Sequence, residues 1–455
     1  MSTNWTKRLE EVTAELIARQ PENQIRPRLE PTRRAVAILG DPQKNYGIIH
    51  ITGTNGKTTT ARIIERILRE HGLRTGRLTS PHLVSINERI AIDGEPISDQ
   101  DLVIAYEESK PLLELADAEL VAAGDQPLTF FEAFTALAFQ IFSDAPIDVL
   151  VLEVGMGGEW DSTNVADADV AVLTSISIDH AKSLGNTVVE IANTKAGIIK
   201  RKSMVVTSPQ LPEVTEVLSS RAKVAEAHFH SGQAFELITH RPDGNGTRFS
   251  VKGLAGHYDN LWMPIIGSHQ AENATTAIAA VEAFLGSGKR AIGDEILRSA
   301  LADATSPGRL QVLSKDPLIV LDGAHNPGGA KTLATAIREH FEAPKSIGLI
   351  SMLADKDARN TLAELRDSFD VLVVTQVENP RRMPAPDLAD TARAIGFTNV
   401  VLEPNLTEAF QYARKRAASE SMALFATGSL YMVGDLLKLF SSDIEVDEDG
   451  EAEVD

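Results

Sequence analysis

Short apolar runs alternate with helical patterns along most of the chain. Residues 46–52 (YGIIHIT) are mostly apolar, and residues 58–72 then repeat apolar positions at helical spacing. Two further β-rich runs, DVLVLEV (148–154) and DVAVLTSI (169–176), follow the helical pattern TFFEAFTALAFQIF (129–142). Buried parallel strands joined by helical crossovers explain this alternation best.

The pattern changes near residue 227. Residues 227–266 contain short strand-like runs with Asp-Gly-Asn-Gly as a hairpin turn, which predicts a small β insertion. The segment SPGRLQ (306–311) is typical of a hinge, and strand–helix alternation restarts after it. We therefore predict an α/β protein. Residues 1–305 form a domain with a mostly parallel sheet and the β insertion, and residues 306–440 form a smaller, Rossmann-like α/β domain.

Composition narrows the choice of function. The 455 residues are too many for one core, and the chain has no cysteine, which excludes disulfides, thiolate metal sites and a cysteine nucleophile and suits the cytoplasm. No apolar run is long enough for a membrane span. The net charge of -20 argues against binding to nucleic acid. Residues 441–455 (SSDIEVDEDGEAEVD) are predicted to be a disordered acidic tail, and a monomer is the default expectation.

A glycine-rich turn lies between the first apolar run and the helix that follows. It reads Gly53-Thr54-Asn55-Gly56-Lys57-Thr58, a Walker A loop shortened because Ile51 stands where the first glycine is usual. Backbone N–H groups and a helix N-terminus can bind phosphate there, and Lys57 can meet the outer phosphates. A tight turn with a solvent-facing lysine is the alternative. The strand–loop–helix context favours ATP binding, which makes residues 1–305 a P-loop ATPase-like domain.

The run ITGTNGKTTT around this turn resembles the loop shared by Mur ligases and folylpolyglutamate synthases. Four later segments resemble the folylpolyglutamate synthase / dihydrofolate synthase pattern: 79–90 (TSPHL, NERI), 153–164 (EVGMGG, DSTN), 179–199 (DH, LG, KAGII) and 321–327 (LDGAHNP). A Mur ligase for UDP-linked substrates also needs a domain before its ATPase, and the residues before Gly53 are too few to build one. The chain thus resembles the folylpolyglutamate synthase branch of the Mur ligase superfamily.

The resemblance implies an ATP-dependent ligase that makes an acyl phosphate. Its substrates would be ATP, L-glutamate and either tetrahydrofolate, whose glutamate tail it extends, or 7,8-dihydropteroate, which it converts to dihydrofolate. Three alternatives stay open: a monofunctional folylpolyglutamate synthase, a Mur-type amino-acid ligase, and a non-catalytic nucleotide-binding protein.

The resemblance also implies a set of site residues. For the nucleotide they are Gly53, Thr54, Asn55, Gly56, Lys57, Thr58, Thr59, Asn273, Arg309 and Asp322. For two Mg²⁺ ions they are Ser80, Glu153, His180 and Lys195, with Lys195 as a carbamate. For the pterin acceptor and glutamate they are Arg26, Arg28, Thr129, Phe131, Asp161, His325 and Ser429. The residues expected to act in catalysis are Lys57, Asp161, His180, Lys195 and Arg309.

Two of these assignments also have a physical argument. Glu153 ends an apolar strand, and in an open α/β sheet that end faces the ligand crevice. Phe131 could stack on a flat pterin, although it fits equally well as helix core.

Overall fold

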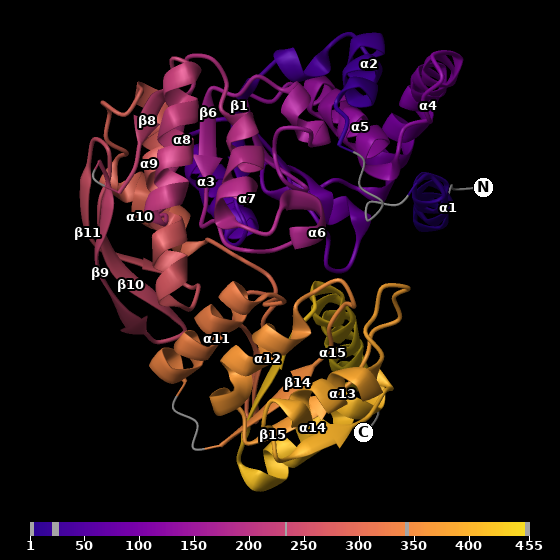
Figure 1. Ribbon diagram of the computed structural model, residues 1–455, viewed down its shortest axis with the longest axis vertical. Helices are drawn as coiled ribbons and strands as arrows, with labels where there is room; N and C mark the ends of the chain where they lie inside the picture. The colour runs from indigo at the N-terminus through magenta and orange to yellow at the C-terminus, as the bar shows by residue number, and fades with distance from the viewer. Residues whose placement is uncertain (1–3, 21–26, 233, 342–344, 451–455) are drawn as a thin grey trace. The chain divides into compact units, whose positions relative to one another are not determined.

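The computed structural model describes residues 4–20, 27–232, 234–341 and 345–450 (Figure 1). The chain divides into two compact units. Residues 1–240, 248–263 and 271–305 form the first, and residues 241–247, 264–270 and those from 306 onward form the second. Within the described residues, no helix combines the length and apolar character that crossing a membrane requires.

An eight-stranded sheet is the centre of the first unit. Its order is β4-β3-β2-β5-β1-β6-β7-β8, with parallel pairing from β2 to β8 and antiparallel pairing of β3 with β2 and with β4. This confirms the predicted mostly parallel sheet. The strands are β1 (Gly47–Thr52), β2 (Thr75–Leu78), β3 (Ile90–Ile92), β4 (Glu95–Pro96), β5 (Val149–Glu153), β6 (Val170–Leu173), β7 (Met204–Thr207) and β8 (His228–His230).

Helices cover both faces of this sheet, so its central strands are buried on both sides and read as continuous apolar runs. On one face, Ile48, Leu150 and Leu152 pack with α1, α2, α4 and α5, and Leu173 and Val205 pack with α7 and α8. On the other face, Thr75 and Arg77 of β2 contact Glu65 of α3, and Gly47 lies against Phe284 of α9. The helices are α1 (Trp5–Ile17), α2 (Glu30–Ile38), α3 (Lys57–Glu70), α4 (Asp99–Ala122), α5 (Phe130–Asp144), α6 (Ala181–Leu184), α7 (Val188–Lys195), α8 (Pro212–Val224), α9 (Ser268–Gly286) and α10 (Asp294–Ala302).

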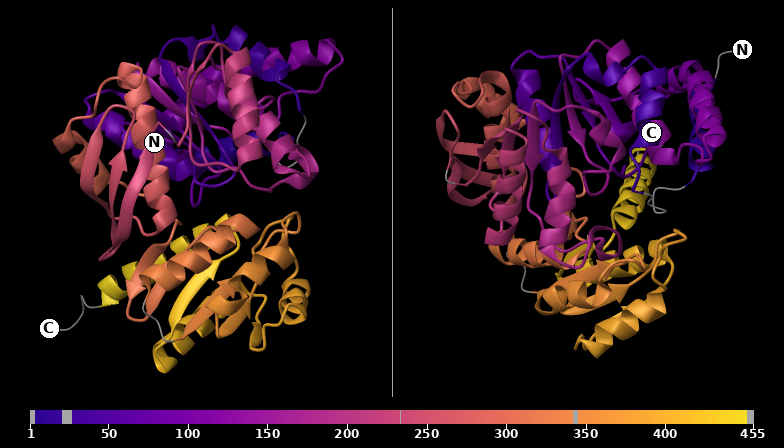
Figure 2. Two further views of the ribbon diagram at one scale, coloured as in Figure 1. Left: turned by 60° about the vertical axis from the view of Figure 1, so that its left-hand side comes forward. Right: turned by 45° about the horizontal axis from the view of Figure 1, so that its top comes forward.

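The β insertion begins later than predicted. The run at 228–230, expected in the insertion, is β8 and pairs in parallel with β7, Met204 opposite His228. The reason is that α8 forms a helical crossover, which returns the chain to the edge of the same sheet in the parallel sense. The insertion is the three-stranded sheet of β9 (Glu236–Asp243), β10 (Gly246–Lys252) and β11 (His257–Met263), visible in Figure 2.

The second unit is a six-stranded sheet with order β12-β13-β17-β14-β15-β16. Only β12 is antiparallel to its neighbour, which confirms the predicted Rossmann-like domain (Figure 2). Its strands are β12 (Gln311–Lys315), β13 (Leu318–Leu321), β14 (Ser346–Ile350), β15 (Val371–Val374), β16 (Val400–Leu402) and β17 (Ala423–Thr427). Its helices are α11 (Pro327–His340), α12 (Ala358–Leu365), α13 (Ala385–Ala394), α14 (Leu406–Glu420) and α15 (Leu430–Gly450).

Helix α15 continues through residues 441–450, where the sequence predicts a disordered tail. No proline or glycine interrupts the chain between Leu436 and Gly450. Extending an existing helix needs no new nucleus, which accounts for the difference. The rest of the predicted tail, 451–455, lies outside the described residues. Short 3-10 helices occur at Pro42–Lys44 (η1), Ile86–Arg89 (η2), Ser162–Val165 (η3), Ala196–Ile198 (η4) and Arg366–Ser368 (η5).

Candidate active site

The glycine-rich turn joins β1 to the N-terminus of α3. Gly56, the residue before this helix, has φ +86°, and a Cβ atom there would collide with the Asn273 side chain on α9. Glycine adopts this positive φ without strain and has no Cβ atom to collide, so it is the residue that fits here. The turn is thus a tight phosphate-loop geometry, and the fold brings the predicted nucleotide residue Asn273 directly against it.

Hydrogen bonds fix the shape of this loop. The backbone N–H groups of Thr54 and Asn55 donate to Ser175 O at 2.8 and 3.3 Å. The Lys57 ammonium donates to the carbonyls of Gly53 and Thr54, both at 3.2 Å, so its charge lies over the loop. An ammonium over a loop at a helix N-terminus suits an anion. Thr59, also predicted for the nucleotide, is buried in the first turn of α3.

Glu153 lies beside the loop. Strands β1 and β5 are parallel neighbours with Ile51 opposite Glu153, so both strands end at the same edge of the sheet. The Thr58 hydroxyl lies 3.0 Å from each Glu153 carboxylate oxygen, and Glu153 is only 1% exposed. Carboxylate and hydroxyl oxygens are the hard donors that Mg²⁺ prefers, so this pair fits the predicted metal.

The other predicted metal residues are spread around the same edge. Ser80 follows the end of β2, which is the parallel neighbour of β5. His180 follows β6, has φ +50°, and its ring Nε2 is 3.8 Å from Asp179 Oδ2. Among the described residues, no three side chains of His, Cys, Asp or Glu are grouped for a metal ion. The predicted set of metal ligands also includes a serine and a lysine, Ser80 and Lys195, and it stays a prediction.

Lys195 is buried beneath the phosphate loop. It ends α7, is 4% exposed, and its ammonium donates to Gly53 O at 2.8 Å. Burial, and after it the charge of Lys57, lowers the pKa of Lys195 to about 7. A lysine in this position is partly a neutral amine near pH 7, which is the form that can react with CO₂.

Asp161 is held in a buried network. Its carboxylate accepts hydrogen bonds from Met156 N (2.8 Å), Thr163 N (3.0 Å) and Thr163 Oγ1 (2.5 Å). Burial raises the pKa of Asp161, and these bonds oppose that shift. His50 Nε2 is 2.8 Å from Thr163 Oγ1. Because that hydroxyl donates to Asp161, His50 must donate to it, so Nε2 carries the proton.

Sequence reasoning missed His50 and Thr163. Thr163 stands in the DSTN segment that carries the resemblance, but no role was assigned to it. For His50 the signal was an imidazole within the apolar run GIIHIT, because a polar residue in a strand buried on both faces needs a partner. Burial lowers the pKa of His50 to about 3, which keeps the ring neutral.

Phe131 lies next to this network. A Cβ on Gly155 would be 2.6 Å from the Phe131 ring and 3.2 Å from Asp161 Oδ2. The ring and the carboxylate therefore flank the same glycine. Phe131 is partly buried, unlike Phe130, which is 5% exposed and belongs to the core.

Two other predicted acceptor residues have structural partners. Thr129 is the N-cap of α5, with its hydroxyl accepting Glu132 N at 3.3 Å. The Arg28 guanidinium donates to both oxygens of Glu132, at 2.9 and 2.8 Å, and to Asp125 at 2.7 Å. These contacts hold the loop before α5. Arg26 lies outside the described residues, and its role in binding the acceptor stays a prediction.

The remaining predicted residues gather within the second unit, where β13 and β17 are parallel neighbours. Asp322 accepts from Leu310 N at 3.0 Å and Ala324 N at 2.9 Å, and burial raises its pKa. Arg309 lies against Gly323 and donates to Gly308 O at 3.2 Å. His325 Nδ1 donates to Gly323 O at 2.8 Å, and Ser429 is buried, with no partner for its hydroxyl among the described residues. Their roles toward nucleotide and glutamate stay predictions.

Comparison with known proteins agrees with this geometry. Residues 109–281 match the family described as Mur ligase middle domain, and residues 308–430 match the Mur ligase, glutamate ligase domain. Fold and phosphate loop together define a ligase of the Mur class. The dihydrofolate synthase/folylpolyglutamate synthase of Mycobacterium tuberculosis is 40% identical over 449 residues, covering 93% of this chain and 92% of the relative. The chain belongs to the dihydrofolate synthase/folylpolyglutamate synthase family.

Solved structures of this family superpose on nearly the whole chain. Folylpolyglutamate synthase from M. tuberculosis, complexed with ADP and AMPPCP, gives a TM-score of 0.91 at 38% identity, covering 96% of this chain and 99% of that one. The E. coli protein FolC, in complex with DHPP and ADP, gives 0.85 at 29% identity, covering 97% of this chain and 100% of that one.

Proposed function

We propose that this chain adds L-glutamate to folates and to 7,8-dihydropteroate, using ATP. Its full-length relatives carry both activities in their names. The observation that carries the proposal is the joint position of Lys57, Thr58 and Glu153 at one sheet edge, with Lys195 buried under the loop. A non-catalytic nucleotide-binding protein has no need of this combination of cation, carboxylate and buried lysine.

The reaction has two steps. An acceptor carboxylate oxygen attacks the γ-phosphorus of ATP, which forms an acyl phosphate and breaks the bond to ADP. The amine of glutamate then attacks the acyl carbon and forms the amide bond. The bond between the acyl carbon and the phosphate oxygen breaks, phosphate leaves, and the amine loses a proton. Lys57 and the N-terminus of α3 bind and orient the phosphates, and such positioning supplies most of the rate in phosphoryl transfer.

Thr58 and Glu153 fit the role of Mg²⁺ ligands, since both present oxygen donors beside the loop. The metal, when bound, neutralises charge on the outer phosphates. His180 and Lys195 would hold a second Mg²⁺, and carbamylation would give Lys195 the oxygen ligand that this metal prefers. Burial of the Lys195 amine and its pKa near 7 support this modification.

The acceptor is proposed to lie along Phe131 and Asp161. The ring offers a flat apolar surface for a pterin, and the buried carboxylate can accept hydrogen bonds from pterin N–H groups. The His50–Thr163 contact holds that carboxylate in place.

Glutamate-dependent ADP release tests the proposal. Lys57→Ala is expected to abolish it with either dihydropteroate or tetrahydrofolate as acceptor. Lys44→Ala is the matched control, because Lys44 is an exposed lysine whose ion pair, among the described residues, is with nearby Asp41. Near-normal turnover by Lys57→Ala would refute the phosphate-loop assignment. Wild-type turnover with tetrahydrofolate alone would instead favour a monofunctional folylpolyglutamate synthase.

A further inference from the structure

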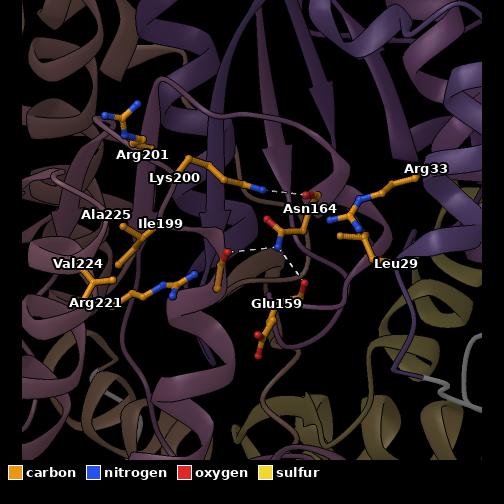
Figure 3. Close-up of a pocket in the computed structure, with 11 residues that line it drawn as sticks. Leu29, Arg33, Glu159, Asn164, Ile199, Lys200, Arg201, Arg221, Val224 and Ala225 are labelled. Atoms are coloured by element: carbon orange, nitrogen blue, oxygen red, sulfur yellow. Dashed lines mark hydrogen bonds between the residues drawn. The ribbon is translucent and has the colours of Figure 1, made fainter.

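A separate basic pocket lies in the first unit, between α2 on one side and η4 and α8 on the other (Figure 3). Its volume is about 430 Å³, which is within the range of small-molecule sites. Arg33 comes from α2, Lys200 and Arg201 from the turn after η4, and Arg221 from α8. Nothing in the proposed reaction uses these four residues.

The charge of this pocket is opposite to that of the chain. Four cations line it with one carboxylate, Glu159, although the whole chain carries -20. Figure 3 shows the Glu159 carboxylate directed away from the Lys200 ammonium. Burial lowers the pKa of Lys200, the Asp167 carboxylate opposes this shift, and Arg33 and Arg221 lower the pKa further. Like charges therefore face one another, and an anion between them would relieve the repulsion.

Two of the cations have no hydrogen-bond or ion-pair partner among the described residues. Within the part of the chain that the structure describes, the guanidinium groups of Arg33 and Arg221 make no hydrogen bond or ion pair. Arg201, by contrast, pairs with Glu226 at 3.1 Å. The Lys200 ammonium donates to Asn164 O at 2.9 Å and lies 3.8 Å from Asp167 Oδ1. Arg33 and Arg221 can thus reach a ligand without breaking a contact.

Asn164 adds a second and different signal. Its Nδ2 donates to the carbonyls of Glu159 (2.9 Å) and Gly197 (3.2 Å), which fixes the orientation of the amide. The residue is 5% exposed, and its Oδ1 has no partner among the described residues. A buried acceptor without a donor costs free energy until a ligand supplies one. The pocket is therefore built for an anion that also carries an N–H group.

We infer that this basic pocket binds a γ-linked glutamyl chain, which combines several carboxylates with amide N–H groups. The inference rests on the proposed function, because such a chain is the tail that the reaction lengthens. The pocket shares two segments with the candidate active site. Asn164 follows Asp161 in the same loop, and Gly197 follows Lys195. An occupied pocket would hold both segments in place.

Binding of γ-linked triglutamate alone, without ATP or pterin, tests the inference by titration calorimetry. The variant Arg33→Gln/Arg221→Gln removes the two unpartnered cations, and Lys7→Gln/Lys223→Gln is the control, with the same change of charge at exposed positions outside the pocket. The wild type and the control are expected to bind alike, with affinity falling as salt rises. The pocket variant is expected to bind about tenfold more weakly.

Three results would overturn the inference. The first is that the wild type does not bind triglutamate. The second is that the pocket variant and the control bind triglutamate with equal affinity. The third is that the wild type binds propane-1,2,3-tricarboxylate, which has no N–H group for Asn164, as tightly as triglutamate or more tightly. Inorganic phosphate is the remaining ligand to be titrated, and binding of phosphate by a wild type that does not bind triglutamate would be a case of the first of these results. Because these titrations contain no ATP, their outcome is independent of the Lys57→Ala assay that tests the proposed function.

Discussion

Replacing Arg28 by alanine would separate two roles for this residue. The resemblance predicts that Arg28 contacts the pterin acceptor, whereas the structure pairs its guanidinium with both oxygens of Glu132 and with Asp125. If the ion pair holds the loop before α5, Arg28→Ala will loosen that loop whether or not substrate is present.

The size of the effect follows from burial. The side chains of Arg28 and Glu132 are 13% and 6% exposed, and without the guanidinium the Glu132 carboxylate keeps a backbone contact with Thr129 N at 2.8 Å. Removing one partner of a buried ion pair costs about 3–5 kcal/mol. Because Arg28 is not fully buried, about 3 kcal/mol is expected, which corresponds to roughly a hundredfold more frequent local opening.

Hydrogen exchange measured by mass spectrometry over residues 125–135 would report this opening. The double variant Arg28→Ala/Glu132→Gln should recover part of the protection, because it no longer leaves a buried charge. Arg34→Ala is the control. Its pair with Glu119 is long, at 3.5 Å, with both side chains more exposed, so its effect in α2 and α4 should be within about 1 kcal/mol. Unchanged exchange in Arg28→Ala, together with a KM for dihydropteroate raised at constant kcat, would refute the structural role.

Three further predictions concern the candidate site. Glu153→Gln should raise the Mg²⁺ concentration that half-saturates ADP release by about tenfold or more, because a neutral amide is a weaker ligand for a hard cation; an unchanged requirement would contradict the assignment. Gly56→Ala, at φ +86° and against Asn273, should weaken ATP binding in a direct titration by at least about tenfold, while Gly124→Ala, at a similar φ of +81° but in open space, should bind ATP normally. Burial lowers the pKa of His50 from 6.5 to about 3. Below pH 6.5 the His50 ring is therefore protonated in the unfolded chain but stays neutral in the folded chain, so the free energy of unfolding falls as the pH drops toward 3. This contribution is about 2 kcal/mol at pH 5, and His50→Gln should flatten the fall of unfolding free energy between pH 6.5 and 4 in urea titrations.

The local pattern of apolar residues, glycines and polar residues determined much of the fold of this protein. The apolar run, glycine turn and helix at 46–72 fold as β1, the phosphate loop and α3, because a strand buried on both faces, a turn with positive φ and an amphipathic helix each depend on neighbouring residues. The alternation after residue 318 likewise predicts the parallel strands of the second unit. Glu153 could be placed at the loop from the end of its strand alone.

Only the tertiary structure decided which distant side chains meet. Lys195 reads as an ordinary surface lysine, yet packing buries it under Gly53, 142 residues earlier in the chain. The pairing of His50 with Thr163, the use of Arg28 as an anchor for Glu132, and the gathering of Arg33 and Arg221 arise in the same way. Periodicity reports that a face is buried. It carries no information about which residues pack against that face, because the crossover connections and the packing of the whole unit determine them.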